Sequence, residues 1–314
     1  MALQELINPA EVAGRAATRE AIVRMARGFS IEATVRTPNA AAECARWLPP
    51  GAAVYVSMLP GQSYHQSVTL AAQLKKAGLV AVPHVTARTL ASEAAAADFL
   101  ARLRGDAEID HVLLLGGDRA PPAGPYASSA ALLQSGLLAK HGMRRIEVAA
   151  YPDGHPAIGD AQLAEALDAK IALAQAQGIA IGVMSQFSFR PDSIIRWAAT
   201  LRKTHPGVPL AVGIAGPANA AALIKFAVRC GVEASASMLG KHTGSVLRLL
   251  AEAGPEPVLQ ATAEYAATPA GANIARCHYF SFGGIERTAR WGNAVADGYF
   301  ELSGTARRMV VAIT

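Results

Sequence analysis

The feature that most constrains the fold is an alternation of short runs rich in β-branched residues with longer Ala/Leu-rich stretches of helical period. This pattern is typical of βα units repeated around a parallel sheet. Eight such units, with no GxGxxG after the first strand, favour a closed barrel over an open doubly wound sheet. We therefore expect an α/β protein with a single (β/α)8 TIM barrel domain over residues 1–314. The expected strands are Phe29–Thr34, Val54–Ser57, Val80–Val85, His111–Leu115, Arg145–Ala150, Ile179–Ser185, Leu210–Ile214 and Cys277–Phe282.

Helical periodicity between the strands predicts the outer layer of the barrel. The residues before the first strand predict an N-terminal helix. Two prolines, Pro191 and Pro217, stand where helices begin. The stretch from Val232 to Gly271 is too long for a simple connection, and its segments 245–254 and 257–267 predict two extra helices before the last strand. The clearest of the other helices are expected at Ser92–Arg104, Leu163–Ala176, Asp192–Lys203 and Ala218–Cys230.

Composition excludes several classes of protein. Apolar residues make up 52% of the 314 and charged residues only 17%, which excludes a disordered chain. The formal charge is +5, but basic residues cluster only in pairs, so nucleic-acid binding is not indicated. The three cysteines lack metal or redox spacing, and the sequence shows neither a signal-peptide core nor an apolar stretch that spans a bilayer. We predict a cytoplasmic protein that does not act at a membrane.

Polar residues follow the predicted strands at the end where βα barrels carry out catalysis. Glu32 is the most informative, because it lies between Ile31 and Ala33 in an apolar strand. An unpaired carboxylate is costly to bury, so Glu32 is either paired structurally or has a raised pKa suited to proton transfer. Its strand-end position favours the second interpretation. The other polar residues near strand ends are Ser57, His84, Thr86, Asp118, Tyr151, His155 and Gln186.

Each of these residues also has an ordinary structural explanation. His84 alone is more often a core histidine, and Gly116-Gly117-Asp118 is also ordinary turn chemistry. Gln186 beside Phe187 suits a flat heterocycle, although phenylalanines are more often core residues. The sequence contains no HxxxH, HExxH or GxSxG motif and no lysine in the predicted strands, so a metal site, a serine hydrolase and a Schiff-base aldolase are all unsupported.

Five short motifs in order carry a resemblance to a known family. They are AVPHVT at 81–86, GGD at 116–118, PYAS at 125–128, VAAYPDGHP at 148–156 and SQFSF at 185–189. Together they resemble the methylenetetrahydrofolate reductase family, from about Phe29 to Ile214 with a weaker echo near HYFSFGG. Members of that family are (β/α)8 barrels that use FAD to move a hydride from NAD(P)H to 5,10-methylenetetrahydrofolate, giving 5-methyltetrahydrofolate.

The resemblance implies roles for individual residues. Glu32 matches the acid that protonates N10 of the folate, and Asp118 matches an acid near the flavin and the pterin. Gln186 matches the glutamine that reads the pterin, with Phe187 beside it in the substrate site. The resemblance implies a cofactor-binding set of Ser57, His84, Gly117, Tyr126, Ala149, Tyr151 and His155 lining the flavin, with Asp168 or Lys170 toward its diphosphate.

Departures from the family pattern fall on the flavin side. Gly116 stands where the family has the Arg of R-G-D, and Ser57-Met58-Leu59 stands where it has T-Y-G. The family has an Asn-Arg pair near its last strand. Gly283-Gly284 stands at that position here, and Arg287 is the candidate replacement for the arginine. We therefore predict that FAD is bound loosely or not at all, and two mechanisms stay open: reduction through flavin, or direct hydride transfer from NAD(P)H. A folate- or flavin-binding accessory protein is the alternative function, and a homo-oligomer is left open.

Overall fold

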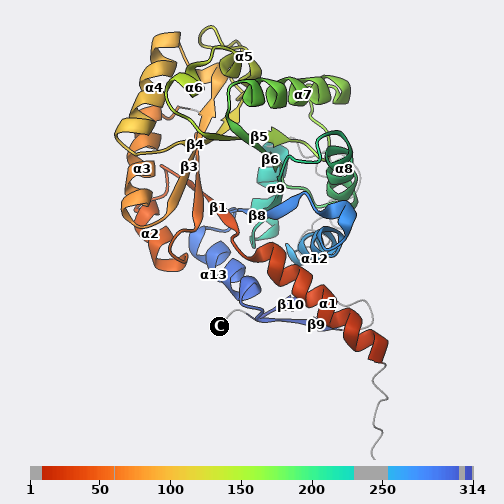
Figure 1. Cartoon of the computed structure of the whole chain (residues 1–314). Helices are drawn as coiled ribbons and strands as arrows, with labels where there is room; N and C mark the ends of the chain where they lie inside the picture. The colour runs from red at the N-terminus through yellow and green to blue at the C-terminus, as the bar shows by residue number, and fades with distance from the viewer. Residues whose placement is uncertain (1–8, 60, 230–253, 304–307, 313–314) are drawn as a thin grey trace, which may run out of the picture.

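Eight parallel strands close into a barrel in sequence order, with β1 pairing both β2 and β8 (Figure 1). The computed structural model describes residues 9–59, 61–229, 254–303 and 308–312. The barrel is the predicted (β/α)8 fold. Its strands are β1 (Ser30–Thr34), β2 (Ala53–Ser57), β3 (Val80–Thr86), β4 (His111–Leu115), β5 (Arg145–Ala150), β6 (Ala180–Ser185), β7 (Leu210–Ala215) and β8 (Ile274–Phe280).

Helices surround the strands on the outside of the barrel (Figure 1). Serine side chains begin three of them: Ser63, Ser92 and Ser128 each accept a hydrogen bond from a backbone N–H of the first turn. The helices are α1 (Pro9–Ala26), α2 (Ala40–Trp47), α3 (Tyr64–Lys76), η1 (Ala87–Thr89), α4 (Glu93–Gly105), α5 (Ser129–Gln134), α6 (Leu137–Lys140), α7 (Asp160–Ala176), α8 (Pro191–Thr204), α9 (Ala220–Arg229), α12 (Glu256–Ala266), η2 (Pro269–Gly271) and α13 (Ile285–Ala296).

Strand alternation divides the buried side chains into two layers. Residues such as Ile31 and Val54 belong to the large apolar core between the strands and the helices. A much smaller apolar cluster, which includes Tyr55, Val82 and Leu113, lies apart from that core. Because successive side chains of a strand point to opposite faces, this second cluster lies inside the barrel. The rest of the barrel interior is therefore available to polar residues.

Several element boundaries differ from the sequence prediction, and two of the differences have a clear local cause. The last barrel strand runs over Ile274–Phe280 rather than Cys277–Phe282, because Ile274 already pairs with Leu210 and the chain turns at Phe282, whose N–H donates to the Phe280 carbonyl at 2.8 Å. Helix α9 begins at Ala220, because the Asn219 side chain accepts from Ala222 N at 2.8 Å and thus caps the helix in place of Pro217.

The predicted helix over 257–267 is present as α12, whereas the one over 245–254 lies outside the described residues apart from Gly254. The N-terminal helix α1 is confirmed and packs against α12, α13 and β8. In the described part of the chain, no helix combines the length and apolar character needed to cross a bilayer.

Sequence reasoning missed a two-stranded antiparallel sheet formed by β9 (Phe300–Ser303) and β10 (Arg308–Val311). Arg19 of α1 holds it in place, because Arg19 Nη1 donates to the Phe300 carbonyl at 2.7 Å and its guanidinium lies 4.7 Å from the Phe300 ring centroid. Each strand has only four residues, too short for alternation to be read with certainty.

Candidate active site

The carboxyl group of Glu32 lies between two imidazoles at the C-terminal half of the barrel strands. Glu32 Oε1 is 3.5 Å from His84 Nε2 of β3 and 3.9 Å from His278 Nε2 of β8. The Glu32 side chain is 20% exposed, whereas those of His84 and His278 are only 8% and 1% exposed. The structure thus brings together two predicted site residues, Glu32 and His84, and adds His278, which sequence reasoning did not single out.

Burial shifts the pKa of each of these three groups toward its neutral form. It raises the pKa of Glu32, and the nearby His84 offsets this only in part. Burial lowers the pKa of His84. Burial and then the charge of Arg276 lower the pKa of His278 to about 3. A protonated carboxyl flanked by neutral imidazoles can donate a proton, which is the property required of a general acid.

A buried polar network lies below this group inside the barrel. Arg276 of β8 donates from Nη2 to Glu147 Oε1 of β5 at 2.8 Å and to the Tyr55 hydroxyl of β2 at 2.6 Å. The Tyr55 hydroxyl in turn donates to Glu147 Oε2. Arg276 Nη1 donates to Ser30 Oγ, and Ser30 Oγ is 2.9 Å from His278 Nδ1. The network therefore connects Glu147 to the imidazole that faces Glu32.

Two further groups approach Glu147 Oε1: Arg145 Nη2 at 3.2 Å and His111 Nε2 at 3.7 Å. Burial opposes the ionisation of Glu147, but Arg276 and these neighbours hold its pKa below its ordinary value. Burial lowers the pKa of His111 to about 4. Sequence reasoning missed this network. The signal that found Glu32, a carboxylate inside an apolar strand, was equally present at Glu147 in RIEVAA.

The turn after β4 requires a glycine. Gly117 has a φ of +86°, and a Cβ there would lie 3.2 Å from the Cβ of Thr86. The following residue, Asp118, is exposed. Burial and then the charge of Asp118 raise the pKa of Tyr151, so the acid of the β4 loop faces the aromatic residue that follows β5.

The loop after β5 is folded around a tight turn. Gly154 N donates to the Tyr151 carbonyl at 3.0 Å, and the Tyr151 and His155 rings meet edge to face with centroids 4.9 Å apart. His155 Nδ1 accepts from Ala157 N at 3.2 Å. Both carboxylate oxygens of Asp153 are buried and have no hydrogen-bond partner among the described residues. The predicted pair Tyr151 and His155 is thus assembled at one loop.

Three other members of the predicted flavin-lining set are Ser57, Ala149 and Tyr126. Ser57 ends β2, and its hydroxyl donates to the Ala33 carbonyl at 3.2 Å. Ala149 pairs with Met184 near the end of β5 and is half-buried. Tyr126 is 5% exposed, and its hydroxyl has no partner within the described part of the chain. Whether these residues contact a cofactor stays a prediction.

Gln186 follows β6 beside the end of β5, since its N–H donates to the Ala150 carbonyl at 2.7 Å. Its Oε1 accepts from Phe187 N at 3.1 Å, which directs the amide nitrogen away from that backbone. Phe187 is 1% exposed, so it supports the wall of the site from behind. Its ring packs edge to face on three half-buried rings, those of Phe189, Phe280 and Phe282.

The residues predicted toward a diphosphate are not assembled with the strand ends. Asp168 Oδ1 lies 2.7 Å from Nε2 of His205, the residue that ends α8. Lys170 is 9% exposed, and burial lowers its pKa to about 8. Arg287 is exposed in the first turn of α13. Asp168 is therefore already paired and Lys170 is largely buried, whereas Arg287 is an exposed cation on the helix that follows β8.

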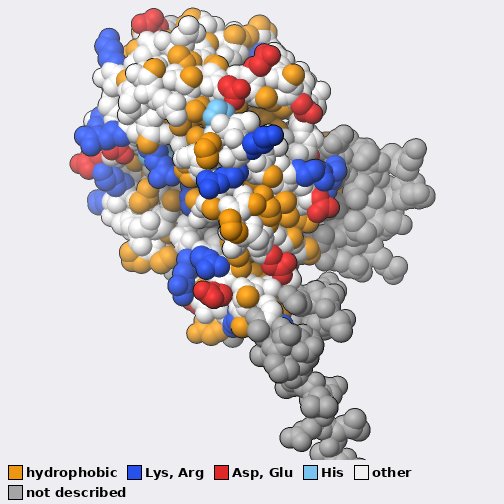
Figure 2. Space-filling model, turned by 45° about the vertical axis from the view of Figure 1, so that its right-hand side comes forward, with side chains coloured by type: hydrophobic (Ala, Val, Ile, Leu, Met, Phe, Trp, Pro, Cys, Tyr) orange, Lys and Arg blue, Asp and Glu red, His pale blue; other side chains and the backbone are white. Residues whose placement is uncertain are grey.

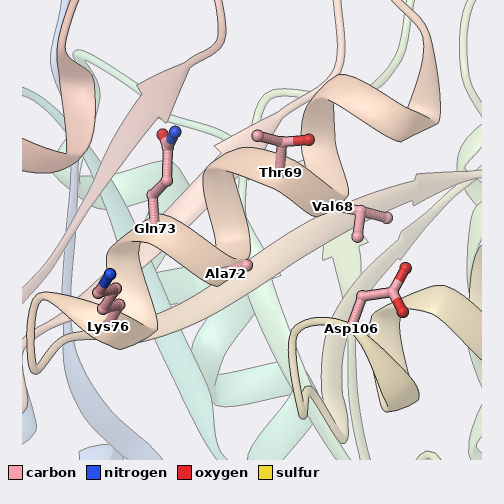
Figure 3. A pocket seen from close by; sticks show the side chains of 6 residues that line it. All are labelled: Val68, Thr69, Ala72, Gln73, Lys76 and Asp106. Carbon is pink, nitrogen blue, oxygen red and sulfur yellow. The ribbon is translucent and has the colours of Figure 1, made fainter.

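A hollow of about 340 Å³ on the outer surface is lined by α3 and by Asp106 after α4 (Figure 3). It contains none of the predicted site residues. On the face drawn in Figure 2, Lys and Arg are interspersed with Asp, Glu and apolar side chains. Among the described residues, no group of three His, Cys, Asp or Glu side chains is arranged to hold a metal ion.

Comparison with known proteins gives a family match. The model of the family described as methylenetetrahydrofolate reductase matches residues 40–244, well over half of the chain. This chain belongs to that family. The matched span begins after β1, so the position of Glu32 comes from the structure.

Solved structures are similar at low sequence identity. One is the crystal structure of a putative spore coat polysaccharide biosynthesis protein E from Chromobacterium violaceum, with 11% identity, a TM-score of 0.37 and coverage of 65% of this chain. The chain spans 63% of the length of that protein. Another is D-psicose 3-epimerase from Clostridium cellulolyticum H10 with D-tagatose, with 12% identity, a TM-score of 0.34 and coverage of 86% of this chain and 92% of that one.

Proposed function

We propose that this member of the methylenetetrahydrofolate reductase family is a cytoplasmic enzyme that transfers a hydride between NAD(P)H and 5,10-methylenetetrahydrofolate, with Glu32 as the general acid. The reverse oxidation of 5-methyltetrahydrofolate uses the same groups. The observation that carries the proposal is the half-buried Glu32 carboxyl between His84 and His278. Its raised pKa favours the protonated form that a general acid needs.

The reaction begins with proton transfer from Glu32 to N10 of the folate. Protonated N10 leaves the methylene carbon, and the N5 lone pair forms an iminium. A hydride from the nicotinamide then reduces this carbon to a methyl group, and Glu32, now a carboxylate, regains a proton from solvent. The barrel contributes positioning and electrostatics, while the hydride chemistry belongs to the nicotinamide.

The pterin ring is proposed to lie against Gln186 and the aromatic rings beside it. Because Gln186 Oε1 is occupied by the Phe187 N–H, its amide hydrogens can donate to the pterin carbonyl. The half-buried Phe189, Phe280 and Phe282 offer flat apolar surface at the same rim. Asp118, exposed after Gly117, completes the polar edge of the substrate site.

The family typically uses FAD, but the residues present here do not fit its diphosphate. Gly116 has no cationic side chain, Asp168 is paired with His205, and Lys170 is buried with a lowered pKa. Two missing charge-assisted hydrogen bonds, each worth roughly 1.5–3 kcal/mol, weaken binding by a factor of more than about 100. We therefore propose weak FAD binding and direct hydride transfer from NAD(P)H.

The test is formation of 5-methyltetrahydrofolate from NADH and from NADPH by colourless purified enzyme, with and without added FAD. We expect turnover without FAD and a loss of at least roughly 100-fold in kcat for Glu32→Gln. Glu165→Gln, an exposed carboxylate on α7, is the matched control. Near-normal kcat in Glu32→Gln refutes the role of Glu32. Strict dependence on FAD with submicromolar affinity refutes the flavin-independent mechanism alone.

A folate- or flavin-binding accessory protein is the second candidate. It predicts tight binding of tetrahydrofolate or FAD without turnover in the same assay. A binding protein gains nothing from a carboxyl with a raised pKa held between two imidazoles, so the Glu32 geometry favours the enzyme.

A further inference from the structure

His278 is the residue near Glu32 to which the sequence assigns no role. Its side chain is 1% exposed, and the ring lies edge to face over Tyr55 with centroids 4.7 Å apart. One ring nitrogen, Nδ1, is 2.9 Å from Ser30 Oγ, and the other, Nε2, faces Glu32 Oε1 at 3.9 Å. The imidazole therefore bridges the buried network and the acid.

The hydrogen bonds of Ser30 favour one of the two tautomers of neutral His278. Ser30 Oγ already accepts from Arg276 Nη1. In the described part of the chain, His278 Nδ1 is the one acceptor within reach of the Ser30 hydroxyl hydrogen. Donation from the hydroxyl to Nδ1 satisfies the Ser30 hydrogen, and it corresponds to the tautomer of neutral His278 that carries its hydrogen on Nε2, toward Glu32.

Arg276 cannot reverse this arrangement, because a guanidinium has only donors. Its other bonds, to Glu147 and Tyr55, fix it in place across the barrel. The orientation of Ser30 thus follows from the ion pair between Arg276 of β8 and Glu147 of β5.

We infer that His278, oriented by Ser30, is a positioning residue that directs its Nε2 hydrogen at Glu32 Oε1 and leaves Oε2 to carry the transferable proton. This inference rests on the proposed role of Glu32 as the acid. His84 Nε2, 3.5 Å from the same oxygen and without a hydrogen-bond partner among the described residues, approaches Oε1 from β3. Two imidazoles thus converge on one carboxyl oxygen.

The contact between His278 and Glu32 must shorten before it can act as a hydrogen bond. The distance of 3.9 Å between His278 Nε2 and Glu32 Oε1 is longer than a hydrogen bond. A shift of the carboxyl oxygen by roughly 1 Å brings the two atoms within hydrogen-bond distance. Substrate N10 then meets the Oε2 hydrogen, because Oε1 is occupied as an acceptor. The acid proton is thus held on Oε2 before it is transferred.

The first experiment is nitrogen-15 NMR of histidine-labelled full-length protein without substrate. The signals of His278 are assigned as those that are missing from the spectrum of His278→Gln. We expect the Nε2–H tautomer in wild type and a mixture of tautomers in Ser30→Ala, with Ser193→Ala, a buried serine on α8, leaving the spectrum unchanged. An Nδ1–H tautomer in wild type overturns the inference, whether or not the protein turns over folate.

The second experiment uses the geometry of two amides. Gln places its amide nitrogen near Nε2 of the imidazole it replaces, whereas Asn places it near Nδ1. We expect kcat to fall about tenfold in His278→Asn, the fold-change of one hydrogen bond, and to stay within about threefold of wild type in His278→Gln. KM should change little in either variant. A merely structural role predicts equal losses.

The outcomes separate the two proposals. If the wild-type protein forms no 5-methyltetrahydrofolate, or if Glu32→Gln keeps a near-normal kcat, the proposed function fails. The NMR result still decides the tautomer of His278. If Glu32→Gln is inactive but His278→Asn and His278→Gln have equal kcat, the positioning role is refuted and the acid stands. Thermal unfolding of both variants checks that their folds are intact.

Discussion

Glu147 is the residue whose loss we expect to destabilise the barrel most clearly. Its side chain is 2% exposed and accepts hydrogen bonds from Arg276, Tyr55 and Arg145. Glu147→Gln keeps the shape and one acceptor oxygen but removes the negative charge. Arg276, only 16% exposed, then stays buried without its counter-charge.

The magnitude follows from these partners. The bond to Arg276 at 2.8 Å is buried and charge-assisted, and such bonds contribute about 1.5–3 kcal/mol. The bond from Arg145, whose side chain is 48% exposed, adds little because solvent screens it. We expect a loss of roughly 2–3 kcal/mol. In a chain of this size each kcal/mol lowers Tm by about 2 °C, which gives a drop of roughly 4–6 °C.

The assay is thermal and urea unfolding of Glu147→Gln beside Glu165→Gln, the exposed control. Adding Arg276→Met to Glu147→Gln removes the unpaired charge, so the double variant should lose at least about 1 kcal/mol less than the sum of the single losses. A Tm within about 1 °C of wild type for Glu147→Gln, or strict additivity, refutes the account of Glu147 as the counter-charge of Arg276.

Two further changes act at the β4 loop. Asp118→Asn should lower kcat with folate while shifting stability by no more than about 0.5 kcal/mol, because the residue is exposed; a large fall in Tm with unchanged kcat would instead indicate a turn role. Gly117→Ala should cost about 1–3 kcal/mol, because φ is +86° and the new Cβ meets Thr86 at 3.2 Å. Urea unfolding beside Gly207→Ala, an open position, measures this, and equal stability of the two variants contradicts it.

The barrel could be predicted from sequence because parallel strands covered by helices are nearly continuous apolar runs between turn residues. Glu32 differs from the apolar residues of such a run, and the structure places it in the middle of β1, two residues before the strand end at which it was expected. The same reasoning extends to Glu147, which also interrupts an apolar strand. In both cases a charged residue inside a buried strand marks the polar interior of the barrel.

The partners of these acids could not be predicted. Arg276 was placed before the last strand, because that strand was expected to begin at Cys277. Its contact with Glu147 joins β8 to β5 across the barrel and depends on the stagger of the closed sheet. His278 faces inward only because β8 pairs with β1 in a register that sets Ser30 beside it. One sequence contains no signal for such a register.

Stability against pH gives a test of Glu32 that is independent of turnover. Its folded pKa is raised by burial, so the folded state binds the Glu32 proton more tightly than the unfolded chain. The resulting stability is fully present below the ordinary carboxyl pKa and is lost as pH rises through the folded value. Each unit of raised pKa corresponds to about 1.4 kcal/mol.

Gln cannot ionise, so Glu32→Gln should gain stability relative to wild type as pH rises from 5 to 8. Because the pKa values of His84 and His278 are lowered, protonation of these residues at acid pH destabilises both wild type and Glu32→Gln. This effect largely cancels in the difference in stability between the two. Thermal unfolding at a series of pH values measures it, and a Tm difference that does not change with pH would show that Glu32 is ionised in the folded protein and cannot act as the acid.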